Sequence, residues 1–170
     1  MTSFCIRLIK VSLFFIFIII PSCDTQDDPL YVGSWQFENQ IITNDLVYNT
    51  TRTLILTRTT YEEVYIIRRE NSGLISGIIG TKGKLAFSRY YMVFKLEELG
   101  TCVRDQSDAC TEEVDWFGEG TQYWTDNFPY FKLTVKGEFD ADELSLRLKR
   151  DLNNDHDIED TGEDVEFNRI

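Results

Sequence analysis

Residues 51–69 read TRTLILTRTTYEEVYIIRR, and this stretch decides the fold class. In its first half Leu54 and Leu56 alternate with Thr53, Ile55 and Thr57, a period of two that is typical of a strand with one buried face. Its second half, Tyr61–Arg69, is rich in β-branched and aromatic residues, which also favour strands. We therefore predict two strands, over Thr51–Thr59 and Tyr61–Arg69.

The same signals recur on both sides of this stretch, and a convincing helical period appears nowhere after residue 30. Glycines at 73, 77, 80 and 83 indicate bends or bulges around short strands. Eight or nine strands with turns between them predict an all-β domain closed as an up-and-down barrel, or a sandwich, because closure hides sheet edges. The further predicted strands are Gly33–Ile42, Leu85–Leu96 (as one bent strand), Tyr130–Val135, Leu144–Leu148 and Val165–Ile170.

The N-terminal segment differs in character from the rest of the chain. Arg7 and Lys10 precede the uncharged apolar run Val11–Ile20, which is followed by Pro21, Ser22 and Cys23. A positive start, a short apolar core and a small residue at the end predict a helical secretory signal peptide over residues 1–22. An ordinary signal peptide and an uncleaved signal anchor remain the alternatives, although the run is short for a membrane span.

Ile20-Pro21-Ser22-Cys23 resembles the lipobox of bacterial lipoproteins. The resemblance implies that Cys23 becomes the acylated first residue of the mature chain and that the partner of this end is a lipid bilayer. It also implies a place in the cell envelope, as an outer-membrane lipoprotein. Residues 23–30 then form an acidic tether, and Asp24–Asp28 is similar to export tags of lipoproteins displayed on the cell surface. Residues 31–170 form one domain.

The charge of the chain excludes one class of partner. The formal net charge is −12, and removal of Arg7 and Lys10 with the signal peptide lowers it to −14. Nucleic-acid binding by general electrostatics needs a basic surface, so we expect no nucleic-acid partner.

Two cysteines belong to the predicted domain. Cys102 and Cys110 lie in a polar stretch, and in an oxidising compartment we expect them to form a disulfide bond. A metal pair is the weaker alternative, because the single histidine, His156, is far along the chain and the sequence has no Cys-x-x-Cys motif.

Gly33-Ser34-Trp35, at the start of the first predicted strand, resembles the Gly-x-Trp signature of lipocalins and of lipocalin-like domains in bacterial lipoproteins. The resemblance implies a barrel that carries a small apolar ligand. It also implies that Trp35 fills the closed end and that Arg169 packs over its ring. The family's Thr-Asp-Tyr motif is absent, since Asn127 follows Thr125 and Asp126.

An acid-rich segment near the C-terminus matches a calcium-binding loop. Oxygen-bearing side chains alternate there as they do in EF-hand loops, and a hydrophobic residue, Ile158, stands at the eighth position. His156 and Gly162 depart from the pattern at positions six and twelve, so a solvated acidic hairpin loop is the alternative. The candidate calcium ligands are Asp151, Asn153, Asp155, Asp157 and Asp160.

The sequence offers no convincing catalytic constellation. His156 is the only histidine and lies within the acidic loop, and no phosphate-binding glycine motif connects a strand to a helix. We therefore expect a binding protein rather than an enzyme, with a surface interaction or scaffold module and a glycan-binding domain as alternatives. The glycan alternative depends on carboxylates beside an aromatic cluster at Trp116, Phe117, Tyr123, Trp124, Phe128, Tyr130 and Phe131. Barrel core and rim is the plainer interpretation of these rings.

Overall fold

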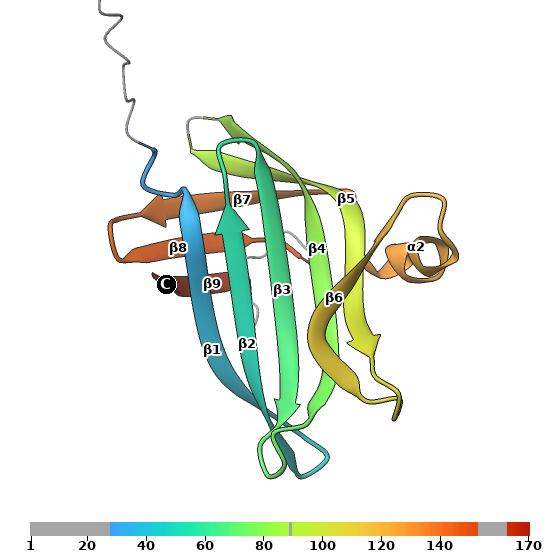
Figure 1. Cartoon of the computed structure of the whole chain (residues 1–170). Helices are drawn as coiled ribbons and strands as arrows, with labels where there is room; N and C mark the ends of the chain where they lie inside the picture. The colour runs from blue at the N-terminus through green and yellow to red at the C-terminus, as the bar shows by residue number, and fades with distance from the viewer. Residues whose placement is uncertain (1–27, 89, 153–162) are drawn as a thin grey trace, which may run out of the picture.

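A computed structural model describes residues 28–88, 90–152 and 163–170 (Figure 1). The predicted signal peptide, Cys23 and most of the tether lie outside these residues. No helix in the described part of the chain has the length and apolar character needed to cross a membrane. The elements are β1 (Gly33–Thr43), β2 (Leu46–Leu56), β3 (Thr60–Arg69), β4 (Ile75–Ser88), β5 (Tyr91–Arg104), β6 (Cys110–Gly118), α2 (Gln122–Asn127), η2 (Phe128–Tyr130), β7 (Thr134–Ala141), β8 (Ser145–Arg150) and β9 (Asp164–Arg169).

The strands close into an antiparallel barrel, as the sequence predicts. Strand neighbours follow the order β4-β3-β2-β1-β9-β8-β7-β5-β6, and a further pairing of β4 with β5 completes the ring. Along the edge opposite to β4, strand β5 pairs with two strands. Tyr91–Lys95 pairs with β7, whereas the C-terminal half of β5 pairs with β6. The described residues thus form an eight-stranded barrel with β6 as an additional strand.

The alternation in β2 has the predicted consequence for burial. Leu54 and Leu56 are buried inside the barrel, whereas Ile55 between them is 40% exposed on the outside. The fully buried centre of this core also includes Trp35, Met92, Leu146, Leu148 and Phe167. Burying a large apolar side chain stabilises a fold by roughly 1.5–3 kcal/mol, so this inward face supplies the main driving force for closure.

The prediction of one bent strand over Leu85–Leu96 is wrong. Strand β4 ends at Ser88, β5 begins at Tyr91, and these two residues pair with each other across the sheet. The segment is therefore a hairpin. Both of its arms carry apolar residues on the inward face, so the turn interrupts the apolar pattern too briefly to be recognised in the sequence.

The expected bends and bulges at the glycines are found only in part. Gly73 follows the turn before β4 with a φ of +68°, and the register of β4 with β5 shifts between Lys82 and Gly83, but β4 itself continues through Gly77, Gly80 and Gly83. Gly80 and Gly83 also make room for close contacts. A Cβ atom at Gly83 would lie 2.0 Å from the carbonyl oxygen of Lys95. A Cβ atom at Gly80 would lie 2.8 Å from the ring of Trp116. Glycine here allows backbone and ring to approach the strand rather than turning the chain.

The region between β5 and β7 departs most from the prediction. Strand β6 was not expected, and Tyr130 belongs to the short helical turn η2, so β7 begins only at Thr134. The unexpected helix α2 is capped by Thr121, whose side chain accepts a hydrogen bond from the Trp124 N–H at 3.2 Å. Trp124 packs against Leu96 and Leu99, so tertiary contact and the cap hold a helix too short to form alone.

Candidate functional site

One end of the barrel is filled around Trp35. The Trp35 side chain is fully buried, and its indole N–H donates a hydrogen bond to the Tyr31 carbonyl at 2.9 Å. Arg169 pairs with Trp35 across β1 and β9, and its guanidinium carbon lies 4.4 Å from the ring centroid. The same guanidinium donates hydrogen bonds to the carbonyls of Leu30 and Val32. Arg169 thus joins the first strand, the last strand and the segment before β1.

Gly33 is required by this arrangement. Its φ of +150° is one that residues with a side chain rarely adopt, and a Cβ atom there would lie 2.9 Å from Nη1 of Arg169. The structure therefore brings together the three residues singled out by the lipocalin resemblance, Gly33, Trp35 and Arg169. Below them, Tyr31 stacks on Phe87 with centroids 4.1 Å apart, so this end is packed with rings.

The other half of the barrel contains a cavity of about 450 Å³. Its lining reaches Ile41, six residues beyond Trp35 along β1, which is about 20 Å for an extended strand. The volume lies within the range of roughly 300–1,000 Å³ that small-molecule pockets occupy. Much of the lining is apolar, contributed by Phe37, Ile41, Ile79, Phe94, Val135 and Val165.

Three charged side chains from different strands meet at the wall of this cavity. Glu63 of β3 accepts hydrogen bonds at 2.8 Å from both Nη1 and Nη2 of Arg150 of β8. Its Oε1 also accepts a hydrogen bond from Nε of Arg52 of β2 at 2.5 Å. The side chains are 10%, 5% and 13% exposed for Glu63, Arg150 and Arg52. We call these residues the charged cluster.

The electrostatics of the charged cluster keep all three groups ionised. Burial by itself would raise the pKa of Glu63, but the adjacent guanidiniums of Arg150 and Arg52 outweigh burial and lower this pKa to about 2. Burial lowers the pKa of Arg52, whereas the Glu63 carboxylate raises that of Arg150 against the effect of burial. Arginine stays protonated in proteins, so the cluster carries two positive charges and one negative charge at neutral pH.

Tyrosines and one lysine also line the cavity. Burial, followed by the nearby Glu63 carboxylate, raises the pKa of Tyr61, which therefore stays neutral. Lys132 donates hydrogen bonds to the carbonyl and the carboxylate of Asp151 at 2.9 and 3.2 Å. Tyr130 is 84% exposed and belongs to the lining as well.

Of the candidate calcium ligands, only Asp151 is among the described residues, and it pairs with Lys132. Asn153, Asp155, Asp157 and Asp160 lie outside the described residues, so the calcium site stays a prediction. Within residues 28–88, 90–152 and 163–170, no group of three His, Cys, Asp or Glu side chains is placed to hold a metal ion.

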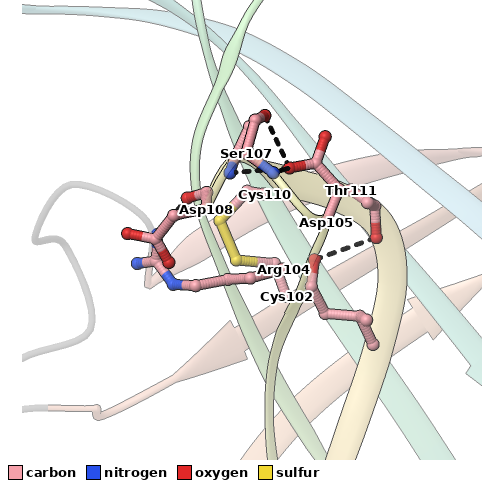
Figure 2. Close-up of polar contacts among 9 residues, drawn as sticks. Cys102, Arg104, Asp105, Ser107, Asp108, Cys110 and Thr111 are labelled. Carbon is pink, nitrogen blue, oxygen red and sulfur yellow. Dashed lines mark hydrogen bonds and ion pairs between the residues drawn. A yellow bond between two sulfur atoms is a disulfide. The ribbon is translucent and has the colours of Figure 1, made fainter.

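The predicted disulfide bond between Cys102 and Cys110 is confirmed, with Cα atoms 5.4 Å apart (Figure 2). It closes the hairpin between β5 and β6. At the tip of this hairpin Asp105 accepts hydrogen bonds from the Ser107 hydroxyl and from the backbone N–H of Ser107 and Ala109, at 2.7, 2.8 and 3.0 Å. These bonds lower the pKa of Asp105. The polar residues around the cysteines therefore hold a tight turn.

The aromatic cluster proposed for a glycan site is divided in the structure. Trp124 is buried and stacks on Phe128 with centroids 4.9 Å apart, as part of a small second core. Trp116 lies against Gly80 and Gly100 on the face of β4 and β5 opposite to the cavity, with the Lys82 ammonium 4.5 Å from its ring. Only Tyr130 and Phe131 of the cluster line the cavity.

The charged cluster was missed in the sequence, although each member carries a signal. Arg52 has the inward phase of Leu54 and Leu56, and Arg150 has that of Leu146 and Leu148. A charged residue on the apolar phase of a strand must be paired or must serve a site, because its burial is unfavourable otherwise. No protein-family model matches this chain, and no curated protein matches its sequence.

Proposed function

We propose that this chain is a cell-envelope lipoprotein, anchored in the outer membrane through acylated Cys23, whose barrel binds a small, largely apolar molecule without catalysing a reaction. The cavity of about 450 Å³ inside the barrel carries the binding proposal. Apolar side chains surround it, and burial of apolar surface drives the binding of such ligands. The lipobox-like Ile20–Cys23 segment supports the membrane anchor.

The cavity favours this function over the two alternatives. A scaffold module needs no internal cavity, and protein interiors are normally close-packed. A cavity of about 450 Å³ reduces the packing of the barrel core, which a module that acts only through its surface does not need. A glycan platform needs an accessible tryptophan face, and of the two tryptophans in the aromatic cluster Trp124 is only 8% exposed, whereas Trp116 is half-buried.

The binding proposal can be tested with N-phenyl-1-naphthylamine, an uncharged probe whose fluorescence rises in an apolar site. We expect saturable binding to the mature domain and its loss in Ile41→Trp, which fills the cavity from its lining. Ile55→Trp is the matched control, because Ile55 is 40% exposed on the outer face. Absence of probe binding, or equal binding in Ile41→Trp, would contradict the proposal. Mass spectrometry of molecules that copurify with the domain would then identify the natural ligand.

The anchor can be tested independently in bacterial cells that express the full chain. We expect the protein in the outer-membrane fraction and Cys23→Ala in the soluble fraction, because acyl chains hold a protein at a bilayer through about 0.8 kcal/mol per buried methylene. Ser22→Ala is the matched control, since it keeps a small residue before the cysteine. Membrane retention of Cys23→Ala would contradict lipid anchoring.

A further inference from the structure

Strand β6 is an additional strand that takes no part in closing the barrel. We propose that its outer edge is a docking surface for another protein, which adds an extended segment to the sheet as a further strand. The segment that fits this edge alternates lysine or arginine with apolar residues. This inference goes beyond the proposed function, because it concerns the outer surface and depends neither on the cavity nor on the lipid anchor.

The first argument is that β6 forms the end of the sheet. Each strand of the ring has a neighbour on both sides without β6, because β5 pairs with both β4 and β7. Within residues 28–88, 90–152 and 163–170, β5 is the only strand that pairs with β6, mainly over Val114–Gly118. Every second residue of an antiparallel strand directs its N–H and C=O away from its partner. One side of β6 therefore offers unpaired backbone groups, which are a template for an extended segment of another chain.

The second argument is that β6 is held firmly in place although the ring closes without it. The disulfide bond between Cys102 and Cys110 joins β6 to β5 (Figure 2). The Trp116 ring lies against Gly80 and Gly100, and a Cβ atom at these glycines would lie 2.8 and 2.9 Å from it. An edge that is fixed in this way does not lose the conformational freedom of a mobile loop when it binds a partner.

The third argument is the charge along this edge. Residues 105–126 contain seven Asp and Glu residues and no Lys or Arg. Of the three exposed acids on β6, only Glu112 has an ion-pair partner among the described residues, namely Arg68. The other two, Glu113 and Asp115, lie two positions apart, so their side chains point to the same face of the strand. A basic residue on an added strand would lie opposite such an acid, where unlike charges stabilise the pairing.

The other face of β6 determines the remaining residues of the partner segment. Val114 and Trp116 alternate with the two acids, and a Cβ atom at Gly100 would lie 2.7 Å from Val114 and 2.9 Å from Trp116. Both side chains therefore point to the outer face of β5. They are half-buried, so apolar side chains on an added strand would remove more of their surface from water.

A second copy of this chain does not fit the same edge. In a two-fold symmetric antiparallel pair, residues of one face lie opposite residues of the same face. Pairing of β6 with β6 would thus bring Glu113 and Asp115 of the two copies together, and like charges across a sheet are destabilising. The acids therefore disfavour self-association and favour a basic partner.

The test measures the binding of a fluorescent heptapeptide, blocked at both ends, in which lysine alternates with valine. We expect saturable binding to the mature domain by fluorescence anisotropy at low ionic strength, and an affinity lower by at least about tenfold when glutamate replaces lysine. Absence of binding would overturn the inference and leave the proposed function intact, because the cavity takes no part in it.

N-methylated peptides distinguish strand addition from simple attraction of charge. Methyl groups on all the lysine amides or on all the valine amides block opposite sides of the extended peptide, and only one side can pair with β6. We expect one methylated peptide to bind at least about tenfold more weakly than the other. Equal affinities of the two methylated peptides would overturn the inference.

Variants of the chain locate the binding at β6. We expect the double variant Glu113→Gln and Asp115→Asn to weaken binding of the lysine–valine peptide by at least about tenfold. Glu138→Gln with Asp140→Asn is the matched control, because it removes the same charge at the same spacing from exposed positions of β7, which has β5 and β8 as neighbours. Equal losses in the two double variants would overturn the inference. Sedimentation of the domain without peptide should show a monomer, and a dimer that the β6 variant alters would assign the edge to a second copy instead.

Discussion

The two halves of the barrel use arginine in opposite ways. At the filled end, Arg169 is exposed, lies on the ring of Trp35 and donates to the backbone carbonyls of Leu30 and Val32. In the hollow half, Arg52 and Arg150 are buried, share the carboxylate of Glu63 and border about 450 Å³ of cavity. The filled end thus uses a cation to fasten strands together. In the hollow half, the two guanidiniums instead join β2 and β8 to β3 through the carboxylate of Glu63.

The contribution of the filled end to stability can be measured at Trp35. We expect Trp35→Ala to lower the free energy of unfolding by about 3–5 kcal/mol, because it removes the largest fully buried side chain and leaves a void under Arg169. Urea unfolding gives this value. Trp116→Ala is the control on the outer face, where the ring is only partly buried, and it should have a smaller effect. A change below about 1 kcal/mol in Trp35→Ala would show that the filled end does not stabilise the barrel.

The second prediction breaks the charged cluster. Glu63→Gln removes the carboxylate that the Arg52 and Arg150 guanidiniums share, and we expect it to lower the free energy of unfolding by about 3 kcal/mol at neutral pH. Glu98→Gln is the matched control, since Glu98 pairs with Lys82 at the surface and should contribute less than about 1 kcal/mol.

The charged cluster also makes the stability of the barrel depend on pH in the acidic range. Glu63 has a pKa of about 2 in the folded barrel, below its usual 4.5, because Arg150 and Arg52 outweigh the effect of burial. Its contribution to stability is therefore fully present above pH 4.5 and is lost as the pH falls toward 2. Urea unfolding across this range should show a loss of stability that is reduced in Glu63→Gln. If the free energy of unfolding falls equally steeply with pH in Glu63→Gln and in the original chain, this assignment to Glu63 is contradicted.

The smallest effect is expected at Arg169. In Arg169→Lys the charge above Trp35 remains, but a single ammonium cannot reach two carbonyls with the geometry of a guanidinium fork, so we expect a loss of about 1 kcal/mol. Arg147→Lys is the control on the outer wall, where an exposed ion pair contributes little because solvent screens it, so we expect a smaller loss than in Arg169→Lys. A larger loss in the control than in Arg169→Lys would place the important arginine elsewhere.

The sequence predicts the secondary structure best in regions where apolar and polar residues alternate regularly. Alternation at Leu54 and Leu56 predicts the strands and the burial, because a strand presents successive residues to opposite faces. It fails at Leu85–Leu96, where two apolar arms join through a turn that interrupts the pattern only briefly. Helix α2 was not predicted because its stability comes from Trp124 packing against β5 rather than from a periodic sequence.

The candidate site was harder to predict than the fold. Gly33, Trp35 and Arg169 were singled out through the lipocalin resemblance, whereas Arg52, Glu63 and Arg150 belong to no motif and come from three strands, with Glu63 and Arg150 separated by 87 positions. Their meeting depends on the register and closure of the barrel, which a single sequence does not specify. The sequence does place these charged residues at strand positions that face the barrel interior. This position indicates burial, but it does not identify the partner of the charge.

The ring of strands is not equally strong around its circumference. Strand β1 pairs with β2 at eleven positions, but in the described residues it pairs with β9 only at Trp35–Arg169 and Gln36–Asn168. Heat or mechanical load should therefore separate the barrel first between its first and last strands. Arg169 lies at that line and contacts both β1 and the segment before it, so a pull applied to the chain ahead of Leu30 would load this contact before the rest of the barrel.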